Sequence, residues 1–445
     1  MTLSRSTLCE ERLVKKGGFS PPELRISITI SQIIRGYTLK NPVKFISAAV
    51  VATVMLAAGC SSSSKSTNIS GGGRTVTVGV LTDLTGAAAV TGDTTVDGIK
   101  AGIGMAAQKG YKIKYVVADT TSSPTGALTA AKTLVQQDHV FAVIMISELG
   151  FGAASYLASQ NIPVIGANVD GPEWLTNRNM FSVFGYADYT KINTVYGKVL
   201  KGLGVTKLGG IAYSIEPASY DFVKSTAKAA QMEGIQVPYI NTNLAFGTTD
   251  LTPVAIAMKN AGINGAVTGV AQATSFALVQ ALELQGVKAT VVLPAGYGGD
   301  LTGGGPGATK IAQGVYFSVV FEPAEMHTAA TERLMNALKT YAGWTGPDPT
   351  EHDYFGYLSI DALVQGLQAA GPNPTQAHFI DTMLGIHNYS AQGLAGRHTM
   401  SFALQGRGSV SGYDNCSWMT RYSGSTFHLV PGMDPICGTT LNQKV

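Results

Sequence analysis

Small and polar residues follow three apolar runs that are typical of buried β-strands. They are Thr85, Gly86 and Ala88 after TVTVGVL, Ser147 and Glu148 after VFAVIMI, and Asn168 and Asp170 after IPVIGA. In an open parallel sheet, ligands bind beyond the carboxyl ends of the strands, where loops present backbone N–H groups. The small residues of the first loop would let its backbone approach a carboxylate. We therefore expect these residues to bind a small polar molecule.

Each of these features also has a structural explanation. The loop from Leu84 to Ala88 suits an ordinary tight turn between a strand and a helix equally well. Asp170 can instead cap a short helix. Glu148 would repel an anion unless its side chain points away.

The sequence offers little support for an enzyme. It contains no G-x-S-x-G, H-E-x-x-H or Walker A run. GGGPGA at 303–308 formally matches G-x-G-x-x-A, but it contains Pro306 and follows another loop, GYGGDL. A dinucleotide loop must instead join a strand directly to a helix. No cysteine or histidine cluster has zinc-ligand spacing. We expect neither a catalytic residue nor a metal or cofactor.

Cys60 ends an apolar run that begins after Lys44. The fifteen residues from Ile46 to Cys60 are too few to span a bilayer, which takes about 20, and they predict a signal peptide. The small residues 57–59 before Cys60 resemble the lipobox of a bacterial lipoprotein, with the usual leucine one place early. A plain secretory signal and a core cysteine are the alternatives.

The chain is expected to be organised around that cysteine. SSSSKSTNISGGG after it should form a flexible tether over 60–73. Residues 1–59 form the leader, of which 1–42 are expected to be a mis-assigned start, with translation beginning at Leu39 or Val43.

The two C-terminal cysteines, Cys416 and Cys437, form an isolated pair. Outside the cytoplasm such a pair is a natural disulfide, and closing a loop of about 20 residues stabilises by roughly 3 kcal/mol. Two free thiols are the alternative.

The formal charge of +3 comes from the leader. Residues 1–59 hold 8 basic and 3 acidic residues, which leaves 23 basic and 25 acidic residues and a net charge of −2 from Cys60 onward. Nucleic-acid binding needs clustered Lys and Arg. The remaining 386 residues suit two domains and no nucleic-acid partner.

Two series of alternating strands and helices follow the tether. The first runs through TVTVGVL, DGIKAGIGMAAQ, KIKYVVAD, PTGALTAAKTLVQQ, VFAVIMIS, SYLASQ and IPVIGA. The second runs from TKINTVYGKVLKGLG through KLGGIAYS and GAVTGVA to KATVVLP. Such alternation predicts parallel sheets covered on both faces. The two helical segments within 326–371 should complete the first domain, and TMSFAL, CSWMTRY and TFHLV should return as strands to the second.

The order of elements and three motifs resemble the type I periplasmic solute-binding proteins, in particular the branched-chain amino-acid group of ABC transporters. The motifs are VTVGVLTDLTGAAAVTGDTTVDGIKAGI, VADTTSSPTGALTAAKTLVQQDHVFAVI and ASQNIPVIGAN, and the likeness covers about 74–440. It implies an α/β fold of two doubly wound parallel-sheet lobes joined by three crossovers. The expected ranges are 74–187 and 315–388 for the first lobe and 188–314 and 389–445 for the second.

The resemblance also implies further site residues. Ser147 would supply a hydroxyl to a carboxylate, and Asn168 and Asp170 further polar contacts. Tyr220 would cover the solute, and Gln272 and Tyr297 follow two later strands. For the two tyrosines a place in the core is the alternative.

One departure from the family concerns the solute. The family usually places an acid after the strand VVLP, to pair with the ligand's ammonium, but Ala295-Gly296 stand there. An unpaired buried ammonium is costly, and Asp300 or Asp170 would have to substitute. The departure favours a solute without an ammonium, such as an amide or a small organic or aromatic acid, whereas the resemblance itself implies a branched-chain amino acid.

The implied partners are the permease and ATPase subunits of an importer, with the membrane reached through a lipid on Cys60. An extracytoplasmic receptor of the same fold that signals to a membrane partner is the alternative.

Overall fold

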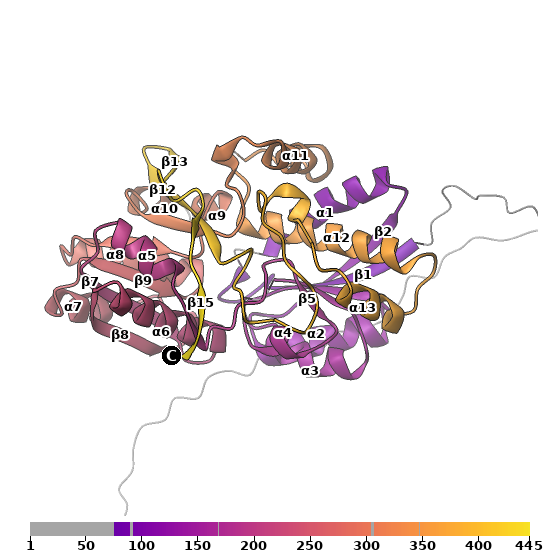
Figure 1. Ribbon diagram of the computed structural model, residues 1–445, viewed down its shortest axis with the longest axis horizontal. Helices are drawn as coiled ribbons and strands as arrows, with labels where there is room; N and C mark the ends of the chain where they lie inside the picture. Colours follow the sequence, from indigo (N-terminus) through magenta and orange to yellow (C-terminus); the bar gives the residue numbers. More distant parts are fainter. Residues whose placement is uncertain (1–74, 90–91, 168, 304–306, 347) are drawn as a thin grey trace, which may run out of the picture. The chain divides into compact units, whose positions relative to one another are not determined.

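The computed structural model describes residues 75–89, 92–167, 169–303, 307–346 and 348–445. Cys60, the leader, the tether and Asn168 lie outside these residues. Two α/β units of mainly parallel strands make up the described chain (Figure 1). The predicted fold class is confirmed.

The first sheet is parallel, with the strand order β2-β1-β3-β4-β5. Its strands are β1 (Thr75–Thr82), β2 (Lys112–Asp119), β3 (Ala142–Ile146), β4 (Val164–Gly166) and β5 (Met180–Ser182). All five residues of the central strand β3 are buried. A strand covered on both faces needs apolar residues throughout, which explains the unbroken run AVIMI.

Helices cover both faces of this sheet (Figure 1). The helices of this unit are α1 (Gly92–Gln108), α2 (Pro124–Gln136), α3 (Phe151–Ser159), α11 (Ala329–Ala337), α12 (Glu351–Ala370) and α13 (Gln376–Leu384). Of these, α1, α2 and α12 contact the strands, and α3, α11 and α13 pack on those three helices. The helix α2 packs against α3, and α1 packs against α12. The helix α12 also contacts β3 and β4, and the completion of the first domain by the helices of 326–371 stays a prediction.

The close approach of α1 and α12 depends on glycine. A Cβ atom on Gly98 would lie 2.2 Å from the carbonyl oxygen of Asp353, and one on Gly356 would lie 2.4 Å from that of Thr95. The N-terminus of α12 is fixed by a capping box in which Thr350 and Asp353 satisfy each other's backbone N–H groups. Together these contacts fix where the first turn of α12 lies.

The second sheet has the order β13-β12-β11-β10-β9-β7-β8, with β14 paired to β12. Its strands are β7 (Lys207–Tyr213), β8 (Gln236–Leu244), β9 (Gly265–Gly269), β10 (Thr290–Leu293), β11 (Tyr316–Val319), β12 (Cys416–Ser423), β13 (Thr426–Leu429) and β14 (Ile436–Cys437). The strands from β7 to β11 are parallel, whereas β12 runs antiparallel to β11. Two further strands, β6 (Lys191–Asn193) and β15 (Thr440–Lys444), pair with each other.

The remaining helices belong mainly to this second unit. They are α5 (Val195–Gly202), α6 (Pro217–Met232), α7 (Thr252–Asn260), α8 (Gln272–Leu284), α9 (Gly299–Gly303) and α10 (Ala308–Ile311), with the short α4 (Glu173–Thr176) before β5. Short 3-10 segments cover Ala324–Met326 and Ala391–Gly393, and a π-helical segment covers Leu338–Ala342. The chain passes between the two sheets after β5, after β11 and before β12.

The prediction of a strand at TMSFAL is wrong. This segment forms a single isolated bridge, between Tyr389 and Met400. Phe402 packs on Phe181 of the first sheet, with ring centroids 5.9 Å apart. The segment TMSFAL therefore buries an aromatic ring in the first unit and forms no strand in the second. CSWMTRY and TFHLV do form strands of the second sheet.

Candidate functional site

A cavity of about 180 Å³ lies at the carboxyl ends of strands from both sheets. Residues that follow strands line it: Glu148 after β3, Val169 after β4, Phe184 after β5, Glu216 after β7, Val270 after β9 and Ala295 after β10. The geometry suits capture of a small solute, as expected for the carboxyl ends of parallel strands.

Three glutamates stand in the wall of this cavity, namely Glu148, Glu216 and Glu351. Burial raises the pKa of Glu148 to about 7, and repulsion by the carboxylate of Asp83 adds to the rise. Burial also raises the pKa of Glu351 to about 8. For Glu216, burial followed by the charge of Glu148 raises the pKa well above its ordinary value. The acids therefore lie close enough to repel one another.

Glu216 has one oxygen without a protein partner. The residue is 4 % exposed, and its Oε2 accepts no hydrogen bond. It sits directly before Pro217 at the start of α6, and its side chain makes no capping bond. A buried carboxylate oxygen normally has a partner, so this oxygen is available to a ligand.

His352 stands beside Glu351 in the first turn of α12 and lines the same cavity. Its Nδ1 lies 3.5 Å from Oδ2 of the buried Asp300. Burial lowers the pKa of His352, but the carboxylates of Asp300, Glu148 and Glu351 outweigh this effect and leave that pKa raised. The acids around His352 thus favour its charged, imidazolium form.

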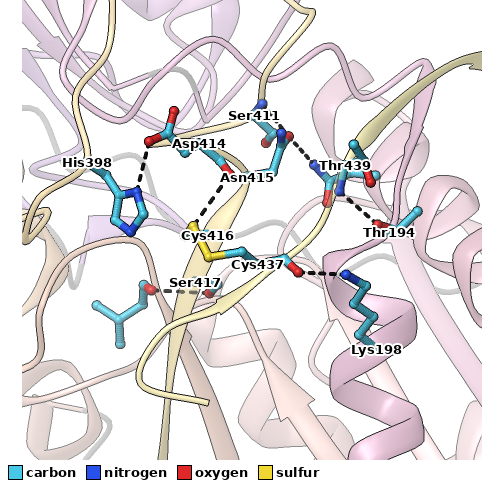
Figure 2. Close-up of a disulfide and its surroundings, with 12 residues drawn as sticks. Thr194, Lys198, His398, Ser411, Asp414, Asn415, Cys416, Ser417, Cys437 and Thr439 are labelled. Atoms are coloured by element: carbon cyan, nitrogen blue, oxygen red, sulfur yellow. Dashed lines mark hydrogen bonds and ion pairs between the residues drawn. A yellow bond between two sulfur atoms is a disulfide. The ribbon is translucent and has the colours of Figure 1, made fainter. Parts of the chain in front are cut away.

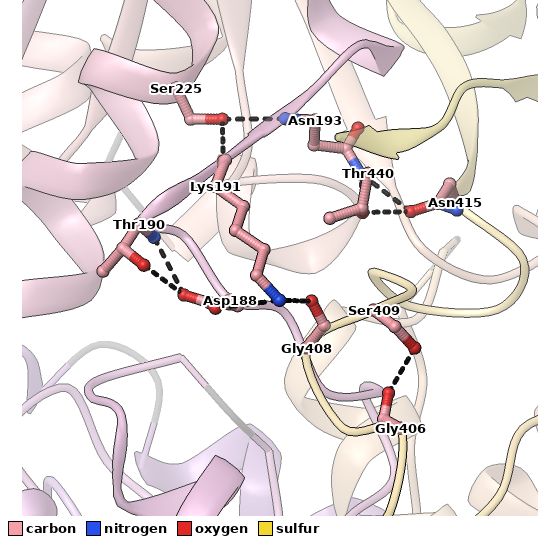
Figure 3. A network of polar contacts seen from close by, with 10 residues as sticks. All are labelled: Asp188, Thr190, Lys191, Asn193, Ser225, Gly406, Gly408, Ser409, Asn415 and Thr440. Carbon is pink, nitrogen blue, oxygen red and sulfur yellow. Dashed lines mark hydrogen bonds and ion pairs between the residues drawn. The ribbon is translucent and has the colours of Figure 1, made fainter. Parts of the chain in front are cut away.

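The lysine of the cavity wall is already paired. Nζ of Lys191 donates a hydrogen bond of 2.9 Å to the carbonyl oxygen of Gly408 and lies 3.3 Å from Oδ2 of Asp188 (Figure 3). Thr190 holds the other oxygen of Asp188 through its hydroxyl at 2.6 Å. Among the described residues that line the cavity, Lys191 is the one lysine or arginine.

Aromatic rings form the apolar part of the wall. Phe222 contacts Tyr196 edge-on with centroids 4.8 Å apart, and Phe184 contacts Phe355 in the same way at 5.6 Å. Tyr189 lies 6.0 Å from Phe222. These five residues line the cavity together with the acids.

The disulfide between Cys416 and Cys437 is present, and Cys416 lines the cavity. It joins β12 to β14, where Nζ of Lys198 donates to the carbonyl oxygen of Cys437 (Figure 2). The disulfide prediction is confirmed. Because β12 follows a crossover between the sheets, this link fixes the chain at the edge of the cavity.

The disulfide also belongs to the one cluster, among the described residues, of three possible metal ligands whose ligand atoms all lie within 4.8 Å of one another. That cluster is His398, Cys416 and Cys437. Both sulfurs are bonded to each other, so neither is a thiolate. Nδ1 of His398 instead lies 2.8 Å from Asp414 (Figure 2).

The loop after β1 does not line the cavity. Thr85 is exposed and donates through its hydroxyl to Oδ2 of Asp119 at 2.6 Å. Gly86 has a φ of 94°, and the buried Ala88 donates its N–H to Ser122 at 3.1 Å. The structure thus shows this loop bonded to the end of β2 and the loop after it.

Ser147 and Asp170 are buried behind the cavity wall rather than in it. The Ser147 hydroxyl donates to Oδ1 of Asp83 at 2.8 Å. Asp170 accepts a hydrogen bond of 2.8 Å from the indole of Trp174, and its own pKa is raised well above normal by burial and by the nearby Glu173. Of the residues after β3 and β4 that the sequence singled out, Glu148 lines the cavity.

Tyr220, Gln272 and Tyr297 do not line the cavity either. Tyr220 is partly exposed, with Nζ of Lys224 4.9 Å from its ring centroid. The buried Gln272 donates to the carbonyl oxygen of Asp300. Tyr297 is fully buried, and its hydroxyl donates to Glu325 at 2.7 Å. Their part in ligand binding stays a prediction.

Glu216, Glu351, His352 and the aromatic wall were not predicted from the sequence. Glu216 could have been found, because it follows the buried strand β7 at its carboxyl end. Glu351 and His352 carried no such signal. They follow Thr350 at a helix start, where acidic residues are common for electrostatic reasons.

The fold has two α/β units, and the cavity lies at the carboxyl ends of strands from both. A family model described as periplasmic binding protein matches residues 75–423. The chain therefore belongs to the periplasmic binding protein family, and its fold is that of the type I members that serve ABC transporters. No curated protein matches the chain.

Solved structures agree on the fold. A possible leucine/isoleucine/valine-binding protein from Rhodopirellula baltica is 13% identical with a TM-score of 0.68, covering 82% of this chain and 98% of its own. A leucine-binding protein from Thermotoga maritima is 15% identical with a TM-score of 0.64, covering 80% and 97%.

A third solved structure is a solute-binding protein of an ABC transporter from R. palustris in complex with 4-hydroxybenzoate. It is 15% identical with a TM-score of 0.64, covering 84% of this chain and 96% of its own. In the part of this chain that the structure describes, no helix is both long and apolar enough to cross a membrane.

Proposed function

We propose that this protein is the extracytoplasmic substrate-binding component of an ABC importer, and that it captures a small solute in the cavity between Glu148 and Glu216. The observation that carries the proposal is the cavity itself, whose wall is built from the carboxyl ends of strands of both sheets. A ligand that contacts both units favours their closed arrangement, which is how hinged lobes respond to solutes.

The range of solutes follows from the cavity and from the proteins of similar fold. The cavity holds about 180 Å³, which suits a molecule the size of an amino acid. Solved relatives include a leucine-binding protein and a protein in complex with 4-hydroxybenzoate. A branched-chain amino acid, an amide or a small organic or aromatic acid is the range to test.

The protein acts without catalysis in this proposal. The buried acids bind and orient a solute, and the permease and ATPase subunits of the importer receive it. A lipid on Cys60 holds the protein at the outer face of the cell membrane. The lobe ranges 74–187, 188–314, 315–388 and 389–445 remain part of the same proposal.

Thermal-shift screening tests solute capture. We expect a rise in the melting temperature with at least one compound among amino acids, amides, urea-like compounds, amines and aromatic acids, because a ligand that binds the folded state stabilises it by mass action. No shift with any compound at millimolar concentration would contradict the proposal.

The importer role and the anchor need cellular tests. Cells lacking this protein should lose uptake of the solute found by screening, and the native gene should restore uptake. Cys60→Ser should abolish metabolic labelling with palmitate and release the protein from the membrane fraction. Palmitate labelling that survives this substitution would contradict the anchor.

A further inference from the structure

The cavity wall carries more acidic groups than basic ones. Asp188 pairs with Lys191 at 3.3 Å, and His352 faces Asp300 at 3.5 Å. Glu148, Glu216 and Glu351 are left without a lysine or arginine partner among the described residues that line the cavity. An anionic solute would therefore enter a cavity that is already short of positive charge.

Glu216 supplies independent evidence for a ligand group. Its Oε2 is buried and accepts no hydrogen bond from the protein, although the residue is 4 % exposed and lines the cavity. An ionised carboxyl group can only accept hydrogen bonds. Burial raises the pKa of Glu216 well above its ordinary value, so the group ionises only beside a partner that stabilises the negative charge, and a positively charged donor forms the strongest such bond.

A single metal ion does not fit this set of acids. Within the described part of the chain, Glu148, Glu216 and Glu351 do not form a group whose ligand atoms all lie within 4.8 Å of one another. A coordinated ion needs oxygens closer together than that, at about 2.0–2.6 Å from the ion. Carboxylates spread over a wider wall suit an organic ligand.

The aromatic rings suit the same ligand. Phe222 and Tyr196 meet at a centroid distance of 4.8 Å within the cavity wall. Aromatic faces attract ammonium groups and also bury the hydrocarbon attached to them. Acids and rings in one cavity are the two chemistries that recognise an organic cation.

We propose that the solute is a small organic cation, with an amine or quaternary ammonium group placed between Glu148, Glu216 and Glu351. This inference rests on the proposed function, because it names the solute class of the same cavity. The family places an acid after the strand that corresponds to β10, where this chain has Ala295. In this proposal the acids that neutralise the solute lie instead after β3, after β7 and at the start of α12.

Binding of such a cation should release protons. The groups that face the three glutamates are Asp83, Asp170, Asp300, His352 and the tyrosines 189, 196 and 213, with the Asp188–Lys191 pair beside them. A cation stabilises the ionised carboxyls, so Glu148 and Glu351 lose protons as it binds. Affinity for a permanently charged cation should therefore increase from pH 6 to pH 9.

The test compares ligands of the same body and different charge by calorimetry on the purified full-length protein at pH 8. One set is benzylamine, benzyl alcohol and benzoate, and the other is leucinamide, leucine and 4-methylpentanoate. Choline and calcium chloride are added as a permanent organic cation and a metal control. At least one organic cation should bind 10-fold or more tightly than its neutral and anionic analogues, and calcium should not bind.

Two variants locate the site. Glu216→Gln should weaken binding of that cation 10-fold or more, whereas Glu283→Gln, which removes the same charge from an exposed position of α8, should leave it within twofold. Melting temperatures of both variants show that they fold. Tighter binding of an anion or of calcium, or benzoate affinity that rises as the pH falls, would overturn the cation assignment and leave solute capture intact. Binding of none of these compounds would count against both proposals.

Discussion

Nδ1 of His352, at the start of α12, lies 3.5 Å from Oδ2 of Asp300, which follows β10 of the second sheet. The pair joins an element of one unit to an element of the other at the wall of the cavity. Both side chains are largely buried, with 14% and 2% of their surfaces exposed. The strength of the His352–Asp300 pair should therefore affect both the stability of the fold and the closed arrangement of the two units.

His352→Gln should destabilise the protein most at low pH. The pKa of His352 is raised in the folded state, so the stability it contributes is fully present below its unfolded pKa near 6.5 and is lost as the pH rises through the folded pKa. Urea unfolding at pH 6 should show a loss of about 3 kcal/mol, as for a broken buried pair. At pH 9 the loss should be smaller.

The matched control is His378→Gln at an exposed position. It should change the free energy of unfolding little at either pH. An equal loss at pH 6 and pH 9 for His352→Gln would mean that the ion pair contributes nothing.

Glu351→Gln should stabilise the protein at high pH. The folded-state pKa of Glu351 is about 8, above its unfolded value near 4.3. Folding therefore favours the protonated group, and the stability present below about pH 4.3 is lost as the pH rises to about 8. Glutamine avoids this loss, so urea unfolding at pH 9 should favour the variant by a few kcal/mol, on the order of the shift at about 1.4 kcal/mol per unit.

At pH 5 the same variant should differ little from the wild type. A stability difference that is constant from pH 5 to pH 9 would contradict the raised pKa. The variant should also bind the solute more weakly, which is the expected cost of removing a destabilising group from a binding site.

Phe222→Ala and Tyr220→Ala distinguish two placements of the site. Phe222 lines the cavity and Tyr220 does not, although the family resemblance assigns the solute contact to Tyr220. We expect Phe222→Ala to weaken solute binding roughly 10-fold, because aromatic contacts each contribute about 1 kcal/mol or more. Tyr220→Ala should stay within about twofold. The reverse order in calorimetry would support the family-based placement.

The helix contact that positions α12 should not tolerate a methyl group. Gly98→Ala would place a Cβ atom 2.2 Å from the carbonyl oxygen of Asp353, and backbone cannot move aside as a flexible side chain can. Overpacking of this kind costs about 1–3 kcal/mol, which should lower the melting temperature and weaken solute binding. Gly307→Ala, with no atom within 4 Å of the added carbon, is the control and should do neither.

The strand ends that form the site could largely be predicted from the sequence. Which residues at those ends line the cavity could be predicted only in part. Buried runs such as AVIMI in β3 identified the parallel sheet, and Glu148 was found because it follows that strand. Thr85 and Ser147 follow strands as well, but they bond to Asp119 and Asp83 instead. The sequence shows which residue follows a strand, but it does not show whether that residue's side chain points into the cavity.

Glu351 shows why the rest could not be predicted. It lies about 200 residues after Glu148, on a helix whose first turn reaches the cavity only because α12 packs closely on α1. That contact depends on Gly98 and Gly356, whose spacing in the sequence gives no sign of what they touch. The core position of Tyr297 could not be predicted either. This residue follows β10, but the backbone turn after that strand directs its ring away from the cavity.

The measurement that tests the central claim most directly is the number of protons released when choline or benzylamine binds, obtained by calorimetry at pH 7.5 in buffers of different ionisation enthalpy. Burial raises the pKa values of Glu148 and Glu351 to about 7 and about 8. A cation seated between them should release a fraction of a proton or more, and Glu351→Gln should reduce that number. Binding without proton release, or with proton uptake, would contradict a cation held by these acids.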